Sequence, residues 1–223
     1  KIKYQFIDKN PNIVVISHAS NVCGVVAPTK EICTMSHQYK SLNVIDMCQT
    51  AGLIDTDLSS SIYDFAVFAG HKTLYATFGI AGFICSGNLK PKPLIYGGAG
   101  IDSANPEVPD TIPERYEVGS QNTMAIAGLY AALNWIKKCG IDNIYAKEKE
   151  NLQKLLNVLS GYTNIRIINP PSTLDQIGVV SCVFEGYSSD SIGQILKEQG
   201  KKKKKKLWGA IIYNALLSAE PGI

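Results

Sequence analysis

Three short polar segments hold the residue types that could do chemistry. They are residues 18–24 (HASNVCG), 46–49 (DMCQ) and 70–72 (GHK), and each lies at or just beyond the end of an apolar run that predicts a strand. In a doubly wound sheet, the loops at the carboxyl ends of the strands can converge on one crevice. We therefore expect these three segments to lie together and to form a site.

A lysine amine and a carboxylate in such a crevice suit a pyridoxal phosphate (PLP) site. This cofactor needs a lysine for its Schiff base and an acid beside its pyridine nitrogen, so that the protonated ring withdraws electrons from the substrate carbon. Lys72 could supply the amine, and Asp46 could keep the nitrogen protonated, because a nearby anion favours the charged form. Gln49 and Asn21 could hydrogen-bond the ring oxygen, and His71 could meet the phosphate together with backbone amides.

Each of these side chains also has an ordinary structural interpretation. An aspartate at a strand end, such as Asp46, is often a turn or cap residue, and a lysine such as Lys72 is usually solvated. His18 and His71 could be hydrogen-bonded structural histidines, and Asn21 near a glycine could serve a turn. The prediction of a cofactor site therefore depends on the order and context of the residues, and on no single one of them.

The elements that must position these segments alternate between strand and helix. Apolar runs predict strands over residues 12–17, 44–47, 64–68 and 80–85, and apolar residues at helical spacing predict a helix over 29–40. The first strand is expected to be buried on both faces, as in a parallel sheet. This order is typical of an α/β fold.

The second half of the chain changes to a helical pattern after a Gly- and Pro-rich stretch, residues 87–113, that predicts a loop. Asn122 is the expected N-cap of the next helix. The remaining expected elements are a helix over 141–159, strands over 165–168 and 179–184, and a helix over 189–199 that Gly200 ends. We therefore assign residues 1–120 to part of a large α/β domain, and residues 121–223 to connecting helices and a small α+β domain.

Composition and charge argue against several classes of protein. Hydrophobic residues make up 45% and charged residues 18% of the 223, which predicts a packed core, and no apolar run could span a bilayer. Six of the 22 basic residues form one block, residues 201–206, and removing them leaves 16 against 19 acidic residues. We therefore expect neither a nucleic-acid nor a membrane partner, although a basic patch remains the alternative for this block.

Two further features concern the cell compartment and the extent of the chain. The six cysteines show no CxxC pair and no zinc spacing, so we expect reduced thiols in the cytoplasm and no metal. The chain begins at Lys1 with no initiator Met and no leader pattern. We therefore expect it to be an excerpt of a longer protein.

Five stretches, in a consistent order, resemble motifs of the cysteine desulfurases of the PLP-dependent class V aminotransferase group. Residues 18–24 are similar to an HxSNVxG stretch, 44–52 (VIDMCQTAG) to a VDxxQxxG stretch, and 64–72 (DFAVFAGHK) to a DFxxFSGHK segment whose lysine binds PLP. Residues 97–98 (GG) and 115–122 (RYEVGSQN) look like the GG and RxExGTxN elements. The resemblance extends through most of the chain.

The resemblance implies the fold type I PLP fold, with a large, mainly parallel seven-stranded α/β domain followed by a small α+β domain. It implies that Lys72 is the Schiff-base lysine and a proton shuttle, that Asp46 pairs with the pyridine nitrogen, and that Gln49 meets the phenolic oxygen. It also places Asn21 near that oxygen and the substrate, and His71 by the phosphate.

The resemblance also implies partners and an activity. Ser120 corresponds to a threonine that reaches the phosphate of the partner subunit, which implies a homodimer with shared sites. The implied activity is the removal of sulfur from L-cysteine to give alanine and an enzyme persulfide, which passes to an acceptor protein. The alternatives are another reaction of the group, such as transamination or selenocysteine lysis, and a non-catalytic protein with a degenerate PLP fold.

The chain departs from the family pattern at three places. Ala69 stands where the family has a serine or threonine on the phosphate, a hydrogen bond worth about 0.5–1.5 kcal/mol. No stretch matches the family's N-terminal region, which stacks on the ring. No cysteine follows Cys182, which we expect to be a buried strand residue, although the family's persulfide cysteine and a substrate-binding arginine lie further on. These departures favour the two alternatives.

Overall fold

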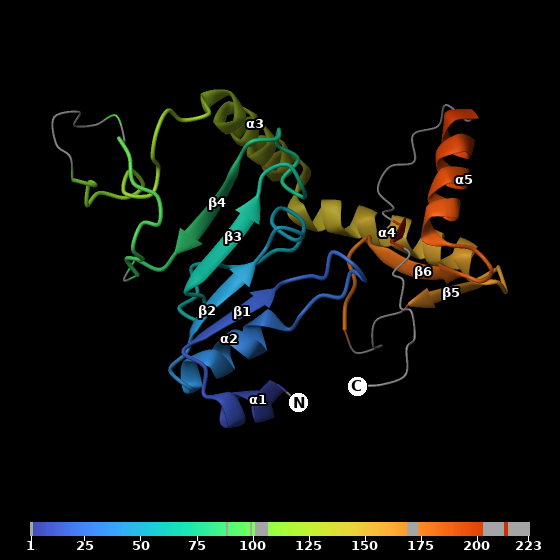
Figure 1. Cartoon of the computed structure of the whole chain (residues 1–223), viewed down its shortest axis with the longest axis horizontal. Helices are drawn as coiled ribbons and strands as arrows, with labels where there is room; N and C mark the ends of the chain where they lie inside the picture. Colours follow the sequence, from blue (N-terminus) through green and yellow to red (C-terminus); the bar gives the residue numbers. More distant parts are fainter. Residues whose placement is uncertain are drawn as a thin grey trace.

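The computed structural model describes residues 2–87, 89–98, 100, 107–168, 174–202 and 212–213. Its elements, in chain order, are α1 (Ile2–Lys9), β1 (Ile13–Ser17), α2 (Thr29–Gln38), β2 (Leu42–Asp46), β3 (Phe65–Ala69), β4 (Ala81–Cys85), α3 (Thr123–Cys139), α4 (Ile141–Leu159), β5 (Ile165–Ile168), β6 (Val180–Phe184), α5 (Ser189–Lys202) and β7 (Ile212–Tyr213). Figure 1 shows two sheets, with α4 running from one to the other.

The first sheet has the order β1-β2-β3-β4, in which β1, β2 and β3 run parallel and β4 runs antiparallel to β3. A helix, α2, connects β1 to β2, as parallel neighbours require a crossover. β3 reaches β4 through a short loop, which suits an antiparallel pair. The expected α/β class with a mainly parallel sheet is confirmed.

The core of this sheet lies between α2 and the strands. Cys33 of α2 packs with Ile45 of β2, Met47 and Ala66 of β3, all of them buried. The half-buried Ile16 of β1 packs against the same cluster. The strand members of this cluster belong to the apolar runs that predicted the strands, and Cys33 lies within the range predicted to be a helix. Burial of one face of each element accounts for its position.

The prediction that the first strand is buried on both faces is wrong. The side chains of Ile13 and Val15 are 57% and 72% exposed, whereas their neighbours along the strand are half-buried. Within the part of the chain that the structure describes, β1 is an edge strand and α2 covers the Ile16 face of the sheet. An apolar run predicts burial, but it cannot say which face a second layer covers.

The second sheet joins β5 and β6 in an antiparallel pair, with β7 parallel to β6. α4 packs on it through Leu152 and Leu159, which meet Val180 of β6. α3 begins as expected, because the side chain of Asn122 accepts a hydrogen bond of 3.1 Å from the Ala125 amide.

Outside the first sheet, one expectation is wrong and another can be compared only over the described residues. Gly200 does not end the last helix, which continues to Lys202, because a glycine costs only about 1 kcal/mol in a helix and lysine is a good helix former. The expected loop over 87–113 is confirmed where it is described, while residues 88, 99, 101–106 and 203–206 lie outside the described residues. Among the described helices, none combines the length and the apolar character that crossing a membrane requires.

Candidate functional site

The predicted site segments begin side by side at one edge of the first sheet. The strand register pairs Ser17 with Asp46, and Asp46 with Val67, so the three parallel strands end together. The loops that follow them therefore leave from the same edge, which lies toward α4 in Figure 1. The predicted convergence of the three segments on the carboxyl ends of the strands is present in the structure.

Asp46 and Lys72 both act on one thiol at this edge. Asp46, at the end of β2, is half-buried, and its Oδ1 accepts a hydrogen bond of 2.9 Å from the Cys48 amide. The pKa of the Cys48 thiol is raised to about 11, chiefly by burial and then by the hydrogen bond and negative charge of Asp46, while the positive charge of Lys72 lowers it. The carboxylate and the amine therefore lie within electrostatic reach of the same side chain.

The loop that carries Lys72 is closed by its own backbone. The Gly70 amide donates to the Ile80 carbonyl (3.0 Å), and the Ala76 amide donates to the Gly70 carbonyl (2.9 Å). A further bond of 2.9 Å runs from the Tyr75 amide to the Lys72 carbonyl. Gly70 is required here, because a Cβ at this position would lie 2.6 Å from Cγ2 of Ile80. The backbone of this loop is thus fixed while the Lys72 side chain is exposed.

Two neighbours of Lys72 have distinct surroundings. The imidazole of His71 is exposed and stacks on Phe78, with ring centroids 4.9 Å apart. Ala69 is buried at the end of β3 and offers no hydroxyl. A phosphate held here would therefore depend on His71 and on backbone amides.

Asn21 lies exposed at the tip of the loop after β1, in a turn formed by residues 21–23. Ser20 closes this turn, because its Oγ accepts from the amides of Val22 and Cys23 (both 3.2 Å). The ordinary interpretation of Asn21, turn chemistry, is therefore compatible with the structure. Gln49 is half-buried in the turn that follows β2, three residues beyond Asp46.

His18 is buried and hydrogen-bonded, which is compatible with the structural interpretation of this histidine. It is 4% exposed, and its Nδ1 lies 2.9 Å from Oγ1 of Thr50. Burial lowers the pKa of His18, which keeps the ring neutral at pH 7. Its amide also donates to the Asp46 carbonyl (2.9 Å), so His18 fastens the first loop to the second.

Ser120 reaches the site indirectly. The Gly119 amide donates to the Gly98 carbonyl (2.8 Å), which joins the two glycine-containing motifs. Nδ2 of Asn122 contacts the Gly79 carbonyl at 3.5 Å, in the loop that carries Lys72. The exposed Ser120 therefore lies in a segment fastened to that loop, but among the described residues it makes no direct contact with Asp46 or Lys72.

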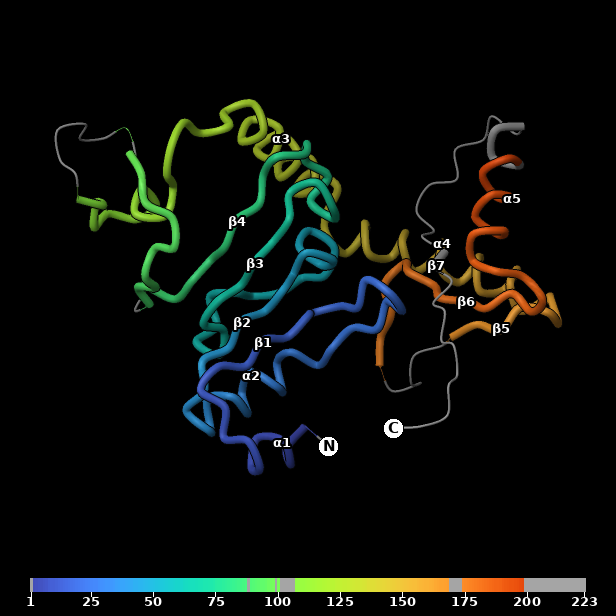
Figure 2. The backbone as a smooth tube through the Cα atoms, viewed as in Figure 1, coloured from blue at the N-terminus to red at the C-terminus, as the bar shows by residue number. Residues whose placement is uncertain are grey.

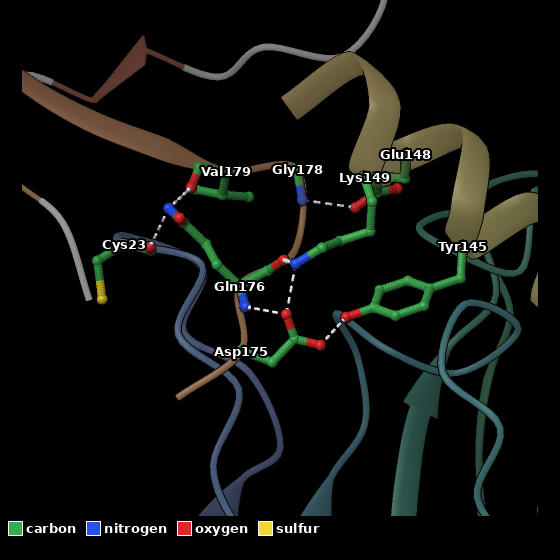
Figure 3. Close-up of polar contacts among 8 residues, drawn as sticks. All are labelled: Cys23, Tyr145, Glu148, Lys149, Asp175, Gln176, Gly178 and Val179. Atoms are coloured by element: carbon green, nitrogen blue, oxygen red, sulfur yellow. Dashed lines mark hydrogen bonds and ion pairs between the residues drawn. The ribbon is translucent and has the colours of Figure 1, made fainter. Parts of the chain in front are cut away.

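A segment far along the chain, residues 174–181, packs against the Asn21 loop and was not predicted to matter. Nε2 of Gln176 donates to the carbonyls of Cys23 (3.1 Å) and Val179 (2.9 Å), as Figure 3 shows. Asp175 meets Tyr145 and Lys149 of α4 in the same view. The two Gln176 contacts end on backbone carbonyls, which every residue has, so residue types in the sequence carried no signal for them.

The residues predicted to bind the cofactor lie on an open face. A cavity of about 420 Å³ lies beside α2 and borders His18, Thr29, Asp57 and Tyr63, but none of the six predicted site residues lines it. Asn21, His71, Lys72 and Ser120 are all exposed. The predicted site is therefore a shallow surface over the strand ends in the described part of the chain.

The donor set suits PLP. A carboxylate has about four acceptor positions, so the contact of Asp46 with the Cys48 amide leaves room for a ring N–H. Lys72 presents an exposed amine from a loop whose backbone is fixed, and His71 beside it offers a nitrogen for an anion. The loss of a hydroxyl at Ala69 weakens this fit without removing it.

Known proteins place the chain in a family. The profile of the "Aminotransferase class-V" family matches residues 3–202, so the chain belongs to this family of PLP-dependent enzymes. It is 32% identical over 198 residues to "Probable cysteine desulfurase 2" of Mycobacterium leprae, covering 87% of this chain and 47% of that protein. It is 30% identical over 203 residues to a cysteine desulfurase of Synechococcus elongatus, covering 89% of this chain and 32% of that protein.

Solved structures agree on the fold. The apo cysteine desulfurase of Thermococcus onnurineus superimposes with a TM-score of 0.78 at 24% identity, over 88% of this chain and 50% of that one. The fold is therefore that of the fold type I PLP enzymes. The chain spans between about a third and a half of the length of these relatives.

Proposed function

We propose that the full-length protein is a PLP-dependent enzyme of the cysteine desulfurase type, which removes sulfur from L-cysteine and leaves alanine. The observation that carries the proposal is the strand register, which pairs Asp46 of β2 with Val67 of β3, so that the carboxylate and the loop with Lys72 begin at the same edge of the sheet. Membership of the class V family and the similarity to cysteine desulfurases support it.

Each predicted residue has a role in this proposal. PLP supplies an electron sink for the substrate carbon. Lys72 holds the cofactor through its amine and moves the proton at the substrate carbon, and Asp46 holds a proton on the pyridine nitrogen. Gln49 and Asn21 orient the ring oxygen, and His71 with neighbouring amides binds the phosphate.

The proposal includes a homodimer in which Ser120 reaches the phosphate of the partner's site. Large apolar side chains are exposed on the Lys72 loop and on α3, among them Phe78 (81%), Met124 (81%) and Tyr130 (70%). Exposed apolar surface of this kind marks association sites. A monomer in sedimentation of the full-length protein would contradict this part.

Three further parts of the proposal extend beyond the site. Residues 1–120 form part of the large domain and residues 121–223 the connecting helices and small domain. The enzyme works in the cytoplasm and passes sulfur to an acceptor protein. Limited proteolysis between the two ranges and cell fractionation test the first two parts, and capture of persulfide sulfur by a cysteine-bearing acceptor tests the third.

An assay with PLP and L-cysteine tests the activity. The full-length protein should form alanine and, with a reductant, sulfide, and Lys72→Ala should abolish both. Lys138→Ala, which removes an exposed lysine of α3, is the matched control and should retain activity. Unchanged turnover in Lys72→Ala would refute the assignment of the catalytic lysine.

A second candidate is another class V reaction, such as transamination or selenocysteine lysis. It is favoured by the family match, which is to class V aminotransferases, whereas a desulfurase needs an accessible thiol that attacks the substrate sulfur. Cys182 itself is 0% exposed in β6, and burial raises its thiol pKa, so it does not suit this role. Formation of a keto acid, without sulfide, would select the transamination alternative.

A further inference from the structure

We infer that Gln176 is a positioning residue for the cofactor site, because its side-chain amide holds in place the loop of residues 19–27 that carries Asn21. This inference depends on the proposed function for the role of Asn21. It adds to that function a residue that comes from the far end of the chain and touches neither cofactor nor substrate.

The amide of Gln176 joins two carbonyls that belong to different parts of the chain. Gln176 is 6% exposed, and its Nε2 donates to the Cys23 carbonyl at 3.1 Å and to the Val179 carbonyl at 2.9 Å. A side-chain amide has two N–H donors on one nitrogen, so it can serve both acceptors together. Without it, the buried Val179 carbonyl and the partly buried Cys23 carbonyl would lose a donor, which is costly where water is excluded.

The backbones of the two segments also meet. The Val26 amide donates to the Asp175 carbonyl (2.8 Å), and the Ile177 amide donates to the Gly24 carbonyl (2.9 Å). Gly24 has φ +72°, and a Cβ there would lie 2.6 Å from the Val179 carbonyl oxygen. The close approach therefore requires a glycine and leaves no room for the loop to move toward segment 174–181.

Helix α4 holds the opposite side of the segment. Lys149 Nζ donates to the Gln176 carbonyl (3.1 Å) and also pairs with Asp175, which accepts a hydrogen bond from Tyr145 (Figure 3). Partial burial acts to raise the pKa of Asp175, but the hydrogen bonds from Lys149 and Tyr145 outweigh it and hold the pKa below its ordinary value. The Glu148 carboxylate of the same helix accepts a hydrogen bond from the Gly178 amide (2.6 Å).

Asn21 depends on this arrangement through its place in the loop. It lies two residues before Cys23, whose carbonyl accepts from Gln176, and hydrogen bonds to Ser20 join residues 20, 22, 23 and 24 in one turn. In Figure 2 the blue loop after β1 reaches the orange segment before β6. The chain of contacts therefore runs from α4 through Gln176 to the turn that presents Asn21 at the strand ends.

Hydrogen exchange of the cofactor-free full-length protein tests whether Gln176 holds the loop. Gln176→Met keeps the length and burial of the side chain and removes both donors, and we expect exchange of the amides of residues 20–26 to accelerate about tenfold. Lys149→Met is the matched control: it loosens the same segment from α4 but keeps the amide on Cys23, and exchange of 20–26 should change less than about threefold. Equal acceleration in both variants would overturn the inference.

Visible absorbance of the PLP-loaded protein tests whether holding the loop positions Asn21. Asn21→Ala should shift the pH midpoint of the cofactor band, and Gln176→Met should shift it in the same direction. The double variant should show no further shift, because both changes act through one contact. Shifts that add, or no shift in Gln176→Met, would overturn the positioning role.

These experiments distinguish failure of the proposed function from failure of the inference about Gln176. If the wild-type protein shows no visible band with PLP, the proposed function fails, while the exchange experiment still decides whether Gln176 holds the loop. If Gln176→Met does not fold, Ser181→Ala takes its place, since Ser181 Oγ donates to the Val22 carbonyl of the same loop. It should act in the same direction on exchange and on the midpoint, and no effect on either would count against the inference.

Discussion

Two loops carry the predicted cofactor residues, and they are held in different ways. The loop with Lys72 is closed by hydrogen bonds between its own residues, from Gly70 to Ile80. The loop with Asn21 is closed at its tip by Ser20. Its Cys23 carbonyl accepts a hydrogen bond from Gln176, which lies 153 residues further along the chain. One loop is shaped locally, and the other depends on a distant segment.

This difference separates two kinds of requirement in the proposed site. The amine of Lys72 and the carboxylate of Asp46 depend on the strands of the first sheet and on a loop that is closed by its own backbone and also contacts Asn122, at the start of α3. Asn21 needs α4 and the segment before β6 as well. Conditions that loosen the second sheet should therefore disturb Asn21 and spare the Lys72 loop.

Replacing Gly24 should have the largest effect on the difference between the two loops. In Gly24→Ala the new Cβ lies 2.6 Å from the Val179 carbonyl oxygen at a positive φ, so we expect a loss of about 3 kcal/mol in the free energy of unfolding. Urea denaturation measures this loss. Hydrogen exchange of the folded variant should accelerate over residues 20–26 and stay unchanged over 70–80.

Gly186→Ala is the control for this variant, because Gly186 has φ +81° and a Cβ added there would meet no atom within 4 Å. It should lose about 1 kcal/mol, the cost of the backbone conformation alone. Equal losses in the two variants would mean that the contact between the loop and Val179 does not matter.

A smaller effect is expected at Cys48, whose alkylation rate reports on the charges of Lys72 and Asp46. Its thiol pKa of about 11, against an ordinary 9.0, leaves about a hundredfold less thiolate at pH 8. In the cofactor-free protein, Lys72→Met removes a charge that lowers this pKa and should slow alkylation roughly two- to fivefold, while Asp46→Asn should accelerate it by a similar factor.

Iodoacetamide labelling followed by peptide mass spectrometry measures the rate at each cysteine across pH 7–10. Cys23, in the other loop, serves as the internal reference and should keep its rate in both variants. If neither change alters the rate at Cys48, Asp46 and Lys72 do not share a crevice.

Much of the first sheet could be predicted from the sequence because each strand there is a short apolar run bounded by polar residues. Asp46 and Lys72 could be predicted as candidates by type and order, since parallel strands bring their carboxyl ends to one edge. The exposed face of β1 could not be predicted, because apolar side chains do not reveal which face a neighbouring layer covers.

The contacts of Gln176 could not be predicted for a different reason. Its amide meets backbone carbonyls across 153 residues, and a carbonyl carries no mark of its partner in the sequence. α1 was also missed, because its apolar residues bury little: Phe6 is buried against Tyr39, whereas Ile7 is 58% exposed. Prediction from sequence thus succeeded for elements whose position is determined by burial of an apolar face. It failed for segments whose position is determined by single contacts to backbone carbonyls.

In the proposed site, Lys72 carries the cofactor over the ends of the parallel strands. Borohydride reduction of the PLP-loaded full-length protein, followed by peptide mass spectrometry, identifies the modified lysine directly. We expect a pyridoxyl group on Lys72, and no stoichiometric modification in Lys72→Ala. Stoichiometric modification of a different lysine in the wild-type protein, with Lys72 unmodified, would contradict it.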